Sequence, residues 1–124
     1  MLAYQPERSI SERMAAALSS SGLQEALRVY RAFRADPRHA HVDTENEINN
    51  LGYQLLRAQK YDQAIAVLQV NAAEYPQSAN VFDSLGEAYL LSGRREEAIR
   101  SYRKSLQLDP MNDNARAALQ KLGG

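Results

Sequence analysis

The sequence predicts an all-α protein built from stacked pairs of helices. Two stretches of equal length, Glu45–Ser78 and Ala79–Asn112, align without a gap, so that matching positions such as Gly52 and Gly86 lie 34 residues apart. An internal period of this length is typical of helix-pair repeats. Apolar residues recur at helical spacing within both stretches, which supports the same fold class.

The part of the chain before these repeats predicts one further, degraded helix pair. Met1–Glu7 is expected to be a loosely ordered lead-in. Ser9 and Glu12 form a capping box, which favours a helix start at this point. The second helix is predicted over Leu23–Ala35, because Asp36 precedes a proline and is therefore disfavoured in the α region. The apolar side of the first helix consists of Ile10, Met14, Ala17 and Leu18.

Each of the two repeats predicts a helix A followed by a helix B. A capping box over Thr44–Glu47 marks the start of helix A in the first repeat, and its helix B is predicted over Tyr61–Tyr75. The second repeat predicts helices over Val81–Ser92 and Arg95–Leu108. Glycine inside a helix costs about 1 kcal/mol relative to alanine, so we interpret the two matched helix A glycines as points of close helix contact. We expect them to face the small residues Ala64 and Ala98 of helix B.

The last helix is predicted over Asn112–Leu122 and has no helix B after it, so we interpret it as the capping helix that a repeat stack needs at its end. The prediction is therefore one domain over residues 1–124 with about seven helices and no strands. Within it, residues 7–43 form the degraded pair and its linker, 45–78 and 79–112 form the repeats, and 113–122 form the capping helix.

The repeat positions also carry a known signature, L-G-x2-Y…A-x3-F…P. In the second repeat it reads Phe82, Leu85, Gly86, Tyr89, Ala98, Tyr102 and Pro110. This pattern resembles the tetratricopeptide repeat family. The resemblance implies a right-handed α-α superhelix of helix pairs with a concave face lined by the A helices.

By register with that family, the concave face predicts a binding groove for a peptide segment or a partner domain. Asparagine amides both donate and accept hydrogen bonds, which suits contact with a peptide backbone. The alternative interpretation is that the asparagines are merely solvated and the leucines pack on neighbouring helices. The predicted groove residues are Asn46, Asn49, Asn50, Tyr53, Leu56, Arg57, Asn80, Asp83, Ser84, Glu87, Leu90 and Leu91, with Asn114, Ala117 and Lys121 on the capping helix.

The charges at these positions argue against one subclass of the family. Some tetratricopeptide proteins hold the C-terminal carboxylate of a chaperone with cations at these positions. Here Asp83 and Glu87 stand in their place, and two carboxylates repel an acidic tail. A basic or neutral segment is the better expectation.

Other functions find less support in the sequence. The formal net charge is zero, so no nucleic acid or membrane partner is indicated. The recurring arginines Arg28, Arg31, Arg34 and Arg38 are interpreted as a solvated helix face in preference to a docking stripe. His39, His41, Asp36 and Asp43 lie in one loop without the oriented spacing that a metal site needs, so we expect neither metal nor cofactor. No signal peptide or apolar span is visible, which favours the cytoplasm.

A second resemblance suggests a different role. The run from Ser9 through Tyr89 is similar to the helical tails that follow the catalytic domain in some bacterial β-lactamase-like serine hydrolases. This alternative implies an accessory domain with a packing or self-association role, and Ile10, Met14 and Leu18 would provide the surface for a homo-oligomer. Neither resemblance implies catalysis by this chain, because the sequence contains no nucleophile–base pair or phosphate loop. Ser101-Tyr-Arg-Lys104 matches S-x-x-K only in isolation.

Overall fold

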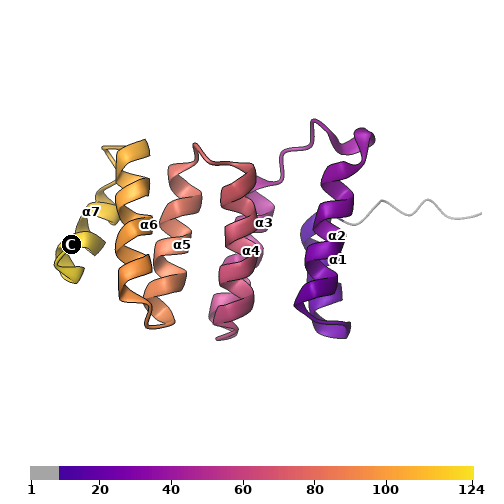
Figure 1. The fold of residues 1–124 in the computed structure, drawn as a ribbon, viewed down its shortest axis with the longest axis horizontal. Helices are drawn as coiled ribbons and strands as arrows, with labels where there is room; N and C mark the ends of the chain where they lie inside the picture. Colours follow the sequence, from indigo (N-terminus) through magenta and orange to yellow (C-terminus); the bar gives the residue numbers. More distant parts are fainter. Residues whose placement is uncertain (1–8) are drawn as a thin grey trace, which may run out of the picture. The chain divides into compact units, whose positions relative to one another are not determined.

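The computed structural model describes residues 9–124, and these residues form helices without any strand (Figure 1). They fall into two compact units, the first ending at Glu47 and the second running from Ile48 to Gly124. The predicted lead-in, Met1–Glu7, lies outside the described residues. In the described part of the chain, no helix is long and apolar enough to cross a bilayer. The prediction of an all-α fold with seven α-helices is confirmed.

The first unit contains one helix pair, α1 (Ile10–Ser20) and α2 (Leu23–Ala35), followed by a short 3-10 helix, η1 (Pro37–His39). The predicted N-cap is present, because the Ser9 hydroxyl accepts a hydrogen bond from the Glu12 amide at 3.2 Å. Ile10 and Met14 are 1% and 0% exposed. Ile10 and Met14 therefore lie in the interior, whereas Leu18, the third residue on which self-association was predicted, is partly exposed.

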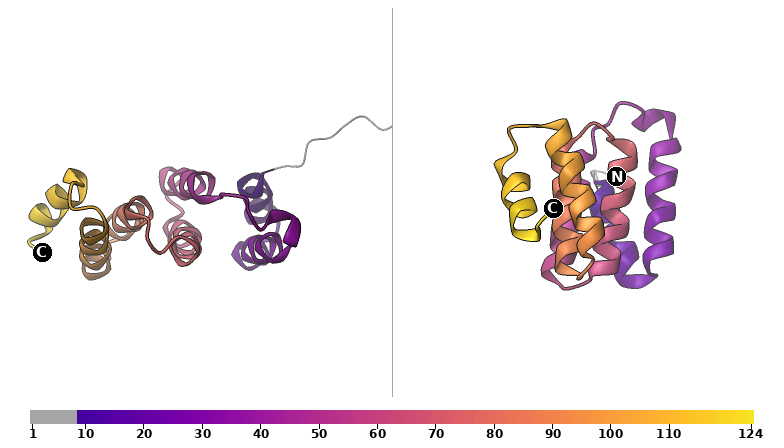
Figure 2. Two further views of the ribbon diagram at one scale, coloured as in Figure 1. Left: turned by 90° about the horizontal axis from the view of Figure 1, so that it is seen from above. Right: turned by 60° about the vertical axis from the view of Figure 1, so that its left-hand side comes forward.

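The second unit contains most of α3 (Glu45–Arg57), then α4 (Tyr61–Glu74), α5 (Ala79–Leu91), α6 (Arg95–Leu108) and α7 (Asp113–Leu122). Helix α5 packs on both α4 and α6, and α6 packs on α7. Seen from above, α3, α5 and α7 lie along one side of this unit, with α4 and α6 along the other (Figure 2). The core between α6 and α7 contains Ala98, Ile99, Tyr102, Ala115 and Leu119.

The two helix A glycines are points of close contact, but their nearest partners differ from the prediction. A Cβ atom on Gly52 would lie 2.6 Å from Cδ2 of Leu68, and one on Gly86 would lie 2.8 Å from the ring of Tyr102. Leu68 and Tyr102 are one helical turn beyond the expected alanines. Side chains on a helix lean toward its N-terminus, so the larger residue of the next turn reaches back over the spot that the alanine is too short to fill.

The turns between helices A and B share one geometry. Gly93 has a φ of 81°, and the residue at the same repeat position, Gln59, has a φ of 61°. At both turns a backbone N–H bonds back to the last helical turn, from Lys60 to Leu55 and from Arg94 to Tyr89. A left-handed residue after a helix is usually glycine, which has no Cβ to oppose this conformation. Gln59 therefore adopts a conformation that glycine would adopt more easily.

Candidate functional site

The candidate site is one side of the second unit, which we call the A-helix face. It consists of the aligned residues of α3, α5 and α7, together with one residue of α6 that reaches between them. Its members are Asn50, Tyr53, Asp83, Glu87, Leu90, Tyr102, Asn114 and Lys121.

Side-chain hydrogen bonds join the three A helices across this face. The hydroxyl oxygens of Tyr53 on α3 and Ser84 on α5 lie 3.3 Å apart, within hydrogen-bond distance. The Asn114 amide of α7 donates to both oxygens of Asp83 on α5, at 2.9 and 3.1 Å. The positions of these polar side chains are thus fixed by bonds between helices as well as by the helices themselves.

The electrostatics of the face are dominated by two carboxylates. Asp83 and Glu87 are four residues apart on α5 and therefore share one side of that helix. Burial raises the pKa of Asp83, against the lowering effect of hydrogen bonds from Asn114 and Asn112. Burial also raises the pKa of Glu87, and repulsion from Asp83 adds to that rise. The site holds negative charge that its surroundings do not neutralise.

Two tyrosines lie close to these charges. Burial raises the pKa of Tyr53, and the charges of Glu87 and Asp83 raise it further. Burial and the same two carboxylates also raise the pKa of Tyr102. Both phenols therefore keep their protons at neutral pH and remain hydrogen-bond donors.

A pocket of about 450 Å³ opens beside these groups, between α5, α6 and α7. Its wall combines a carboxylate, an aromatic ring and short apolar side chains, and Leu90 on its wall is 41% exposed. Binding pockets commonly combine an apolar lining with a few polar groups that fix orientation. The lining residues are Glu87, Leu90, Tyr102, Asn114, Ala117, Ala118, Lys121 and Leu122.

The predicted site residues are not equally accessible. Asn50, Arg57, Asn80 and Leu91 are exposed, whereas Asn49, Ser84 and Leu56 are buried, so Asn49 and Ser84 offer little open surface. Asn46 is exposed in the first turn of α3 and belongs to the first compact unit. The A-helix face defined above is therefore narrower than the predicted groove.

Two contributors were not expected from the sequence. Tyr102 was named in the sequence only as a position of the repeat signature, yet it is one of the residues that line the pocket. Asn112 caps α7, where its Oδ1 accepts from the Ala115 amide at 3.1 Å, and its Nδ2 donates to the Ser105 hydroxyl at 2.8 Å. The predicted helix began at Asn112 itself, whereas α7 begins at Asp113 with Asn112 as its cap. The signal was the preference for asparagine at a helix cap.

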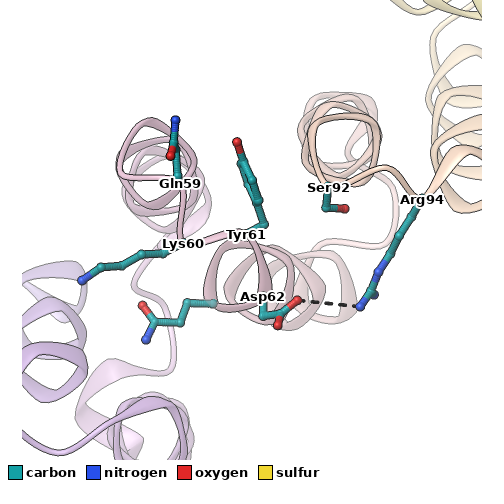
Figure 3. A pocket seen from close by; sticks show the side chains of 7 residues that line it. Gln59, Lys60, Tyr61, Asp62, Ser92 and Arg94 are labelled. Carbon is teal, nitrogen blue, oxygen red and sulfur yellow. Dashed lines mark ion pairs between the residues drawn. The ribbon is translucent and has the colours of Figure 1, made fainter.

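A second pocket of the same unit, about 470 Å³, lies at the turns that join helices A and B (Figure 3). Asp62 points toward Arg94, with 3.7 Å between Oδ1 of Asp62 and Nη2 of Arg94, while the Lys60 side chain extends away from this pair. Exposed ion pairs contribute about 0–1 kcal/mol. The other residues that line this second pocket are Gln59, Tyr61, Gln63 and Ser92. The polar groups of this mixed set do not converge on one point.

Three of the recurring arginines and one of the two histidines of the first unit have partners within that unit. Arg28 pairs with Glu25, Arg38 pairs with Asp36, and Arg34 donates to the Val42 carbonyl at 2.9 Å. The His39 ring stacks on Phe33, with 3.9 Å between ring centroids. Across residues 9–124, no group of three or more histidine, aspartate or glutamate side chains is placed to hold a metal ion.

Comparisons with known proteins identify the repeats. Family models described as tetratricopeptide repeat match residues 79–112 and 50–78. Superkiller complex protein 3 of Mus musculus is 40% identical over 55 residues, and the human protein is 39% identical over 59 residues. These segments cover 44% and 48% of this chain, but only 4% of each relative.

Solved structures show the same fold over nearly the whole chain. The first tetratricopeptide domain of Spaghetti (RPAP3), bound to the HSP90 peptide SRMEEVD, has a TM-score of 0.63 at 22% identity and covers 92% of this chain and 87% of its own. The second such domain of human RPAP3, in complex with the HSP70 peptide SGPTIEEVD, has a TM-score of 0.63 at 22% identity, with coverage of 94% and 93%. A MamA variant has a TM-score of 0.62 at 24% identity, with coverage of 92% and 83%.

The repeat period, the paired helices and the family models thus agree. The two matched segments together span half of the chain, and the chain belongs to the tetratricopeptide repeat family.

Proposed function

We propose that this chain is a non-catalytic interaction module that binds a peptide segment or partner domain of another protein on the A-helix face. The observation that carries the proposal is a row of side chains that two sets of hydrogen bonds hold across three helices. Tyr53 on α3 bonds with Ser84 on α5, and Asn114 on α7 bonds with Asp83 on α5. Such a row lies beside a pocket of about 450 Å³. Surfaces of stacked repeats are extended, which suits binding of an extended segment.

The relatives support the class of function. Two solved domains of the same fold hold peptides, and tetratricopeptide repeats are typically non-catalytic interaction modules. The alternative, an accessory tail of a bacterial hydrolase, gains no support, because the relatives named above include no hydrolase and the curated ones are mammalian. That resemblance and the predicted homo-oligomer both stay predictions.

A selection with randomised peptides displayed on phage tests the proposal. The selected peptides are then synthesised, and their dissociation constants are measured by isothermal titration calorimetry with wild type and variants. We expect Tyr53→Ala to weaken binding at least tenfold. Arg103→Ala is the matched control, because Arg103 is exposed on α6 and lines none of the pockets described above.

Two results would count against this function. The selection yields no peptide that binds the folded chain, or the selected peptides bind Tyr53→Ala and Arg103→Ala equally well. In the second case the chain binds peptides elsewhere, and the A-helix face is not the site.

A further inference from the structure

We propose that the pocket between α5, α6 and α7 takes an arginine side chain of the bound segment, so that the ligand of the A-helix face is a basic peptide. This inference rests on the proposed function and adds the chemistry of the ligand. Three features of the second unit carry it: unmatched hydrogen-bond acceptors, an apolar wall beside them, and charge that no group of the described chain balances.

The acceptors on this face outnumber their donors. The Glu87 carboxylate accepts no hydrogen bond from residues 9–124, and Asp83 accepts side-chain hydrogen bonds only from the cap region of α7.

A ligand that supplies only donors fits this pattern. The guanidinium group of arginine has five N–H donors and no acceptor, and its planar fork binds carboxylates through two parallel hydrogen bonds. Glu87 lines the pocket, so this paired interaction with a carboxylate is available to an arginine side chain. Tyr102 also lines the pocket but is only 3% exposed, so we assign no ring stacking to the ligand.

The apolar part of the pocket suits the stem of such a side chain. Long basic residues bury their methylene groups on apolar surface while the charged end stays near polar partners. The apolar part of the lining is formed by Leu90, Ala117, Ala118 and Leu122. An arginine entering along these residues would place its charged end at Glu87.

The charge of the site favours the same ligand. In the described chain, neither Asp83 nor Glu87 forms an ion pair. Lys121 lines the pocket but lies outside ion-pair distance of both carboxylates. Two carboxylates and one ammonium leave the site with a net negative charge. Burial raises the pKa of Glu87 and repulsion from Asp83 raises it further. A bound cation would offset that repulsion.

The test uses three synthetic peptides that differ at one position, chosen as the position most often basic among the selected peptides. That position carries arginine, citrulline or glutamate. Citrulline has the size and shape of arginine without its charge. We expect the arginine peptide to bind wild type at least tenfold more tightly than the citrulline peptide, and the glutamate peptide to bind most weakly.

Protein variants assign the effect to the pocket. We expect Glu87→Gln to weaken the arginine peptide at least tenfold and to leave the citrulline peptide unchanged. Glu96→Gln is the matched control, since Glu96 is exposed on α6 and pairs with Arg95 outside the pocket. Lys121→Ala is expected to strengthen the arginine peptide, because it removes a like charge.

The outcomes separate this inference from the proposed function. Equal affinity for the arginine and citrulline peptides, or loss of binding in Lys121→Ala, overturns the arginine assignment while peptide binding stands. Selected peptides without any basic residue would also overturn the arginine assignment. If Glu87→Gln instead converts a dimer to a monomer in sedimentation velocity without peptide, the occupant is a second copy of the chain, and the assignment to a separate partner is wrong.

Discussion

The Tyr102 ring lies so close to Gly86 that a Cβ atom on the glycine would be 2.8 Å from its Cε1 and Cζ atoms. This contact links the fold to the candidate site. It lets α6 approach α5 closely, and it sets the position of a ring that lines the pocket between α5, α6 and α7. The glycine is thus needed for the space that it leaves to the tyrosine.

The first prediction follows from this contact. Gly86→Ala is expected to lower the free energy of unfolding, because overpacking costs about 1–3 kcal/mol, which exceeds the gain of about 1 kcal/mol in helix propensity. Gly52→Ala is expected to cost less, since its neighbour Leu68 has rotatable bonds where Tyr102 has a rigid ring. Urea denaturation measures both values. A more stable Gly86→Ala variant would show that helix propensity outweighs the contact.

The second prediction concerns the two equivalent turns. Gln59 has a φ of 61°, and a non-glycine residue pays about 1–2 kcal/mol in this region. Gln59→Gly is therefore expected to stabilise the chain by about 0.5–1 kcal/mol, after the larger loss of backbone entropy on folding. The reverse change, Gly93→Gln, is expected to destabilise it by a similar amount, because no atom lies within 4 Å of the new Cβ. Thermal unfolding of both variants checks the pair. If both substitutions stabilise the chain, or both destabilise it, backbone strain is not the cause of the stability change.

The helices themselves could be predicted well from the sequence, because the residues that start and end a helix lie within or next to it. Asp36-Pro37 ends α2 at Ala35, and the expected bounds of α6, Arg95 and Leu108, are those observed. The positive φ of Gln59 was not predicted, because glutamine does not favour this conformation as glycine does. Only its position 34 residues before Gly93 indicates the shared turn.

The packing and the site could be predicted only in part. The repeat showed that the helix A glycines lie at helix contacts, but choosing Leu68 and Tyr102 over the alanines requires the direction in which side chains lean. The bond between Asp83 and Asn114 joins residues 31 positions apart, and its geometry depends on how α7 is set by its cap. The role of the A-helix face and the assignment of residues 1–124 to a single domain remain predictions.

The third prediction tests that cap. Asn112→Ala removes the acceptor for the Ala115 amide and is expected to cost about 0.5–2 kcal/mol. Asn112→Ser is the matched control, because serine also caps a helix. Hydrogen exchange measured by mass spectrometry is expected to rise in α7 for the alanine variant and much less for the serine variant. Equal exchange in both variants would mean that the bond to Ser105, and not the cap, holds α7 in place.

The fourth prediction concerns pH. The pKa values of Asp83 and Glu87 lie above their ordinary values of 3.8 and 4.5 in the folded chain. Such groups bind protons more tightly in the folded state, so their stabilising contribution is present below the unfolded pKa and is lost as pH rises through the folded pKa. In the double variant Asp83→Asn/Glu87→Gln, the two substituted side chains are uncharged at every pH. Relative to wild type, it is expected to gain stability as the pH is raised from 4 to 7.

Urea denaturation of wild type and the double variant at several pH values in this range, without peptide, measures the difference directly. Glu96→Gln is the control, because Glu96 is an exposed carboxylate of α6 that lies outside the pocket lined by Glu87. A double variant whose advantage shrinks as the pH rises would mean that the two carboxylates are stabilised in the folded chain. In that case the site would already hold the positive charge that we assign to its ligand.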